Sequence, residues 1–102
     1  MEESMYQRLE TAIKRLAEID EQLMDENVTR DLANFRAISK ERAILDPQVT
    51  LFLRYKKLQN DKEQALEMAA ESDPEIAELG KEELKAITEE EPKIIEELRI
   101  LL

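Results

Sequence analysis

Apolar side chains recur along this chain at alternating spacings of four and three residues. The pattern is clearest near the start, at Met5, Leu9, Ala12, Leu16, Ile19 and Leu23. This spacing places all six side chains on one side of an α-helix, as in the contact line of a coiled coil. Gly80 is the only glycine in 102 residues, so little in the chain opposes a helix. The sequence therefore predicts an all-α fold, either an antiparallel helical bundle or a long helical hairpin of three to four helices.

The middle of the chain carries two further contact lines of the same spacing. The first line follows Phe35, Ile38, Arg42, Leu45, Val49 and Phe52. The second line follows Leu51, Tyr55, Leu58, Lys62, Ala65 and Ala69. Residues 25–29 supply cap-type side chains, so we expect a turn there and a new helix starting near Thr29 or Asp31.

Prolines mark expected interruptions of the helices. Asp46 and Pro47 make a good cap and first-turn pair, and proline inside a helix costs roughly 3 kcal/mol, so we expect a break or a kink at Pro47. Asp73 is expected to cap a last helix that starts at Pro74. Pro92 is expected to bend or interrupt this last helix, because it leaves one carbonyl without a donor.

The contact line of the last helix includes a glycine. It reads Ala77, Gly80, Leu84, Ile87, Glu91, Ile94, Leu98 and Leu101. Gly80 has two interpretations: it allows another helix to approach closely, or it weakens its own helix by about 1 kcal/mol relative to alanine.

The chain lacks most side chains that carry chemistry. It has no histidine and no cysteine, and no glycine-rich segment that could hold a phosphate. The glutamate clusters at 82–83, 89–91 and 96–97 point in different directions around a helix, which favours a solvated acidic face over a metal site. We therefore expect an interaction module that is not an enzyme and has no cofactor, metal or small-molecule substrate. An enzyme with an unusual carboxylate site is a rival interpretation.

Charge is unevenly distributed along the chain. The net charge is −10, and residues 71–102 alone hold eleven acids and four bases, whereas residues 30–57 hold seven bases and three acids. The overall field argues against a general nucleic-acid binder, so only the middle segment could contact RNA, and only locally. Within it, Arg30, Arg36 and Lys40 form a candidate docking patch. Arg42 lies on the contact line and is expected to snorkel or to pair with a carboxylate of the last helix.

The ends of the chain bear on its location and its organisation. The acidic start lacks the basic and apolar parts of a secretory signal, and no apolar run is long enough for a membrane span, so we expect a cytoplasmic protein without a membrane partner. One domain over residues 1–102 is expected. The chain ends on the apolar residues 100–102, which suggests a fragment cut at the edge of a domain.

Two segments resemble the amino-terminal domain of bacterial class I peptide chain release factors. They are FRAISKERAIL at residues 35–45 and DPEIAELGKEEL at residues 73–84. The start, MYQRLE at 5–10, and the close, ELRILL at 97–102, are also similar to that family in order and spacing. The likeness covers nearly the whole chain and is closer to release factor 1, which reads UAA and UAG, than to release factor 2.

The resemblance implies a role that the residues alone do not. It implies the N-terminal helical arm of a factor that terminates translation by promoting peptidyl-tRNA hydrolysis, docked near the ribosomal stalk base and affecting recycling by a partner GTPase. The Gly-Gly-Gln tripeptide and the Pro-x-Thr codon-reading segment of such factors are absent, so release and codon reading would reside elsewhere. Arg42 also stands where the family commonly has an aromatic residue. The main alternative is a free-standing coiled-coil protein that self-associates or binds a partner helix.

Overall fold

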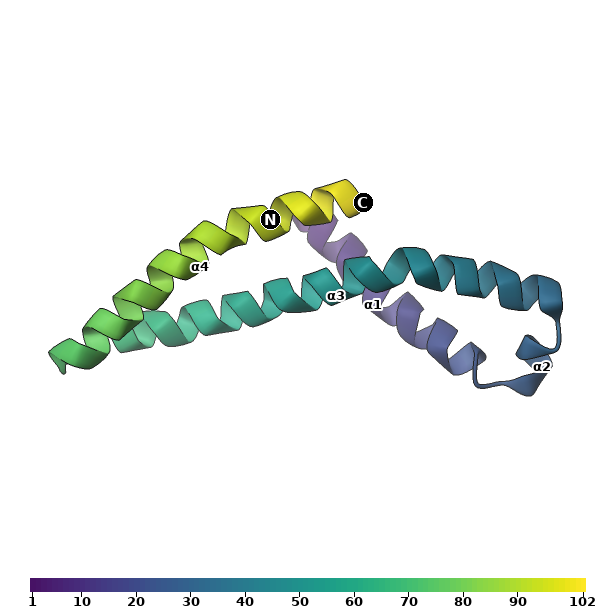
Figure 1. The fold of residues 1–102 in the computed structure, drawn as a ribbon, viewed down its shortest axis with the longest axis horizontal. Helices are drawn as coiled ribbons and strands as arrows, with labels where there is room; N and C mark the ends of the chain where they lie inside the picture. Colours follow the sequence, from purple (N-terminus) through teal and green to yellow (C-terminus); the bar gives the residue numbers. More distant parts are fainter. The chain divides into compact units, whose positions relative to one another are not determined.

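The structure, a computed structural model, describes all residues from Met1 to Leu102 and contains helices only. The helices are α1 (Glu3–Gln22), α2 (Glu26–Thr29), α3 (Leu32–Ala69) and α4 (Pro74–Leu101) (Figure 1). The predicted all-α fold is confirmed. The chain divides into two compact units, unit 1 from Met1 to Thr50 and unit 2 from Leu51 to Leu102, and the boundary falls inside α3. The prediction of a single domain over 1–102 stays a prediction.

In unit 1, α1 lies antiparallel to the first part of α3. The predicted contact line of α1 supplies most of the buried side chains, with Leu9 and Ile19 fully inaccessible to solvent. The buried positions of the unit are Met5, Leu9, Ala12, Ile19, Ile38, Gln48 and Val49. Phe35, predicted on the α3 contact line, is instead 36% exposed and lies in the first turn of α3.

The connection between α1 and α3 is built from capping side chains. The Asp25 carboxylate accepts a hydrogen bond from the backbone N–H of Asn27 at 2.9 Å, which caps the single turn of α2. Asp31 does the same at the start of α3, where its carboxylate accepts from the N–H of Asn34 at 3.2 Å. The expected turn is therefore present, and the new helix begins next to Asp31, as predicted.

Helix α3 continues through Pro47 from Leu32 to Ala69. From the sequence we expect either a break or a kink at Pro47, and the uninterrupted helix shows that the prediction of a break is wrong. A proline removes one backbone hydrogen bond, but the buried side chains of Val49 and Phe52 follow it at helical spacing, and their burial favours continued helix. Pro92 likewise lies inside an uninterrupted α4, between the buried residues Ile87 and Ile94, so the predicted interruption is absent there too.

Unit 2 is a hairpin of the second part of α3 and α4, which run side by side (Figure 1). Its buried side chains come from both helices: Phe52, Tyr55, Leu58, Ala65, Ile87, Ile94 and Leu98. The rings of Phe52 and Tyr55 stack with centroids 6.3 Å apart, and the Lys56 ammonium lies 5.0 Å from the Phe52 centroid. The predicted cap is present, since the Asp73 carboxylate accepts from the N–H of Glu75 at 2.9 Å, with Pro74 in the first turn.

Gly80 marks a close approach of α4 to α3. A Cβ atom at this position would lie 2.8 Å from the carbonyl oxygen of Ala65 and would collide with the backbone nitrogen of Ala69. Only a glycine fits between the two backbones without a shift. Of the two interpretations of Gly80, the close helix approach is therefore the correct one.

The two polar residues on the contact lines of unit 2 pair with each other. The Lys62 ammonium lies 3.4 Å from a Glu91 carboxylate oxygen, and Arg54 pairs with Glu90 beside them. Each of these two bases of α3 thus has an opposite charge on α4. No helix in the structure combines the length and apolar character that a membrane span requires.

Candidate docking surface

The solvent side of α3 in unit 1 carries positive charge without acidic neighbours. Five residues at spacings of three, one, three and three make up this side, which we call the outer face: Ala33, Arg36, Ala37, Lys40 and Ala43. All five are exposed. Arg36 and Lys40 lie opposite the buried Ile38, because residues two positions apart on a helix point about 200° apart. Alanine side chains flank the two cations, and the exposed Leu32 and Ile44 lie one turn before Arg36 and one turn after Lys40.

Arg36 and Lys40 have no ion-pair partner in the structure. No carboxylate lies within ion-pair distance of either side chain, although acids outnumber bases 25 to 15 in the chain. At a spacing of four residues, their Cβ atoms lie roughly 6 Å apart on one face of the helix. The structure therefore brings together two of the three residues of the predicted patch, and it leaves their positive charge unneutralised.

Arg30, the third predicted residue, is placed differently. It lies in the connection at the end of α2, outside α3, and its guanidinium lies 3.3 Å from the Glu26 carboxylate. Both side chains are largely exposed, so the pair is weak and can exchange for another anion. Arg30 is thus a neighbour of the outer face and not part of it.

Arg42 pairs with α1 and not with α4, so the predicted partner helix was wrong. Its Nε donates to an Asp20 carboxylate oxygen at 2.6 Å. The reason is position: Arg42 belongs to the part of α3 that packs in unit 1, whereas the acidic α4 packs against the later part in unit 2. The hydrogen bond to Asp20 raises the pKa of Arg42 above its ordinary value.

A second charged pair between α1 and α3 was not predicted from the sequence. The Arg15 guanidinium donates two hydrogen bonds to Glu41, at 2.6 and 2.8 Å, and a third to Glu18 at 3.2 Å. The hydrogen bonds that Arg15 donates lower the pKa of Glu41, and the same bonds to Glu41 and Glu18 raise the pKa of Arg15. Such a two-pronged pair fixes the register of α1 on α3. It could not be found from spacing, because it depends on which two helices are neighbours.

The acidic residues form no arrangement that could hold a metal ion. No group of three or more carboxylates comes together in the structure. The glutamates of α4 instead lie on its exposed sides or pair with bases, as Glu90 and Glu91 do. The outer face of α3 thus remains the candidate surface that the charge pattern favours.

Comparison with known proteins gives one clear result. The sequence model of the family described as the PCRF domain matches residues 12–102, which include all of α2, α3 and α4 and half of α1. No solved structure matches the chain. The matched segment contains both resemblance segments identified above, at 35–45 and 73–84.

Proposed function

Because this chain belongs to the PCRF-domain family, the N-terminal helical domain of class I peptide chain release factors, we propose that it is the docking arm of a factor that terminates translation at UAA and UAG codons. The family match supports a release-factor role in translation termination, and with it an interaction with the ribosome. The choice of UAA and UAG rests on the resemblance to release factor 1. The docking role rests on the outer face of α3.

The outer face suits a contact with the ribosome because its charge is available. Arg36 and Lys40 lose no intramolecular ion pair when they bind an anion, so the full attraction goes to the partner. Ribosomal RNA phosphates are such anions, and a contact of this small size stays local, since the rest of the chain is acidic.

The more specific partners follow from the family resemblance alone. We propose that the arm docks near the ribosomal stalk base and influences recycling by the partner release-factor GTPase, in the cytoplasm. We further propose that the chain contributes no catalytic group, because it holds no Gly-Gly-Gln tripeptide and no nucleophile with a base beside it. Added alone to termination complexes, it should release no peptide from peptidyl-tRNA.

The proposal is tested by sedimentation of the purified chain with ribosomes at low and at moderate salt. The test variant is Arg36→Gln with Lys40→Gln. The matched control is Lys81→Gln with Lys85→Gln, because these two lysines are also exposed, unpaired and four residues apart, but on α4. We expect the test variant to bind about tenfold or more weakly and to lose part of its salt dependence, since each phosphate contact steepens that dependence.

Three outcomes would contradict the proposal. The chain could fail to bind ribosomes at any salt concentration, or both double variants could weaken binding equally. The chain could also form stable oligomers in sedimentation at several concentrations, without ribosome binding. That last result would favour the alternative of a self-associating coiled-coil protein.

A further inference from the structure

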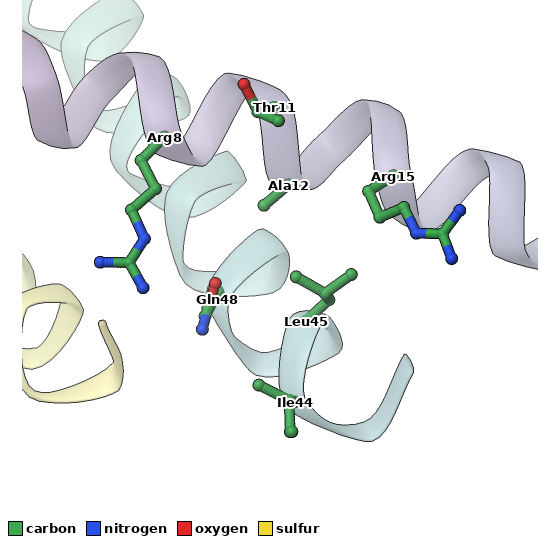
Figure 2. A pocket seen from close by; sticks show the side chains of 7 residues that line it. All are labelled: Arg8, Thr11, Ala12, Arg15, Ile44, Leu45 and Gln48. Carbon is green, nitrogen blue, oxygen red and sulfur yellow. The ribbon is translucent and has the colours of Figure 1, made fainter. Parts of the chain in front are cut away.

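A hollow lies between α1 and α3 within unit 1. It has a volume of about 280 Å³. Figure 2 shows Ala12 of α1 and Leu45 of α3 pointing toward one another across it, with Arg8 and Arg15 on either side along α1. We call it the α1–α3 groove, and it is lined by Arg8, Thr11, Ala12, Arg15, Ile44, Leu45 and Gln48.

The volume of the groove limits the size of the group that can bind there. Sites for small molecules and cofactors usually measure roughly 300–1,000 Å³, and this hollow lies just below that range. Its volume suits one or two side chains of a partner. One wall is apolar, because Ile44 is 57% exposed and Leu45 is half-buried beside it. An aliphatic side chain placed there would bury Ile44, which is otherwise left in water.

The charged side chains that line the groove indicate that an occupant would also carry an acidic group. Two arginines line it and no acid does. Arg15 is already held by Glu41 and Glu18, whereas Arg8 takes part in no hydrogen bond or ion pair. Five of the seven arginines in the chain are paired with acids; only Arg8 and Arg36 are not. The Arg8 guanidinium is thus an open donor for a carboxylate, next to an apolar wall.

We propose that the α1–α3 groove binds an acidic peptide segment of a protein partner. A carboxylate of the segment pairs with Arg8, and a neighbouring branched aliphatic side chain rests on Ala12, Ile44 and Leu45. A nucleic acid is the less suitable occupant, because phosphates would leave the apolar wall in water. This inference does not depend on the ribosome-docking role, and its test does not involve ribosomes.

The test measures fluorescence anisotropy of a labelled synthetic peptide made of glutamate and leucine, titrated with the chain. A lysine and leucine peptide of the same length and a short RNA duplex serve as comparison probes. The variants are Arg8→Gln and Ile44→Ser, and the matched control is Lys14→Gln, an exposed α1 base without a partner that does not line the groove. Circular dichroism verifies that each variant is as helical as the parent.

We expect saturable binding of the glutamate and leucine peptide. Arg8→Gln should weaken it about tenfold, as expected for a charge-assisted hydrogen bond, and Ile44→Ser should weaken it about fivefold. Lys14→Gln should leave the affinity within about twofold of the parent value. The proposal is overturned if the peptide does not bind, if the lysine and leucine peptide binds as well, or if Arg8→Gln and Lys14→Gln have equal effects. Tighter binding of the RNA duplex, unchanged by Ile44→Ser, would also overturn it.

Discussion

Within the two units, the helices pack against each other in different ways. In unit 1, α1 and α3 are joined by Arg15 with Glu41 and by Arg42 with Asp20, and a hollow remains between the helices. In unit 2, α3 and α4 come so close at Gly80 that no Cβ fits. Both units thus join their helices through buried side chains and ion pairs, and the close backbone contact at Gly80 is the feature particular to unit 2.

This difference indicates where the chain can carry function. A close-packed pair of helices tolerates little change, because an added methyl group must displace backbone. Unit 1 contains no glycine at its helix contact, and both proposed contacts, the outer face of α3 and the α1–α3 groove, lie in this unit, although unit 2 also has a hollow of about 220 Å³.

The largest effect is expected from the two phenylalanines, one in each unit. Phe52 is fully buried in unit 2 and Phe35 is 36% exposed in unit 1. Phe52→Ala should lower the free energy of unfolding by about 3–5 kcal/mol, because it removes a buried ring and leaves a cavity. Phe35→Ala should cost less than about 1 kcal/mol. Urea denaturation followed by circular dichroism measures the free energy of unfolding of both variants. Similar losses for Phe52→Ala and Phe35→Ala would contradict the prediction.

The next effect concerns a single methyl group, which is added in unit 2 and removed in unit 1. Gly80→Ala should destabilise the chain by about 1–2 kcal/mol, because overpacking against backbone exceeds the gain in helix propensity. Ala12→Gly, which removes a methyl from α1, should destabilise it by about 1 kcal/mol. Thermal unfolding followed by circular dichroism detects each change. If Gly80→Ala raised the melting temperature, the close approach at Gly80 would be refuted.

A smaller, stabilising effect is expected at Gln59. Its side-chain Nε2 is buried without a hydrogen-bond partner, which is costly for an amide. Gln59→Leu should therefore raise the free energy of unfolding by up to about 1 kcal/mol. Gln64→Leu, at an exposed position of the same helix, is the control and should change little. Destabilisation by Gln59→Leu would mean that the amide has a partner after all.

The smallest effect is the pH dependence of unit 1. The pKa of Glu41 is lowered by Arg15, so the folded chain binds fewer protons at this site than the unfolded chain does. The stabilisation is therefore present above the ordinary carboxylate pKa and is lost as the pH falls through the lowered value. The difference in melting temperature between the parent and Glu41→Gln should be largest near neutral pH and shrink in acid. A melting-temperature difference between parent and variant that grows as the pH falls would contradict this prediction.

Much of the fold was predictable because local rules decide it. The contact line from Met5 to Ile19 and the cap at Asp73 followed from spacing and side-chain type alone. A break at Pro47 and an interruption at Pro92 are absent because burial along the contact lines outweighs one missing backbone hydrogen bond. Propensity describes a single helix, and these prolines lie in helices that are stabilised by their neighbours.

The candidate surface was only half predictable. Arg36 and Lys40 were found because a spacing of four places them on one face, which is a property of one helix. The pairs Arg15 with Glu41 and Arg42 with Asp20 depend on which helix packs against which, and spacing does not contain that information. The pairing of Lys62 with Glu91 could have been predicted, since each is the charged residue on an otherwise apolar contact line and the two lines belong to neighbouring helices.

The central claim is that the outer face of α3 meets the ribosome and that α4 does not. The chain has no cysteine, so Ala37→Cys and Ala86→Cys each allow one photoreactive label on an exposed position of α3 and α4, respectively. After illumination with ribosomes, the label at position 37 should cross-link to ribosomal RNA or protein, and the label at position 86 should do so several times less. Equal cross-linking from both positions, or stronger cross-linking from position 86, would contradict the account.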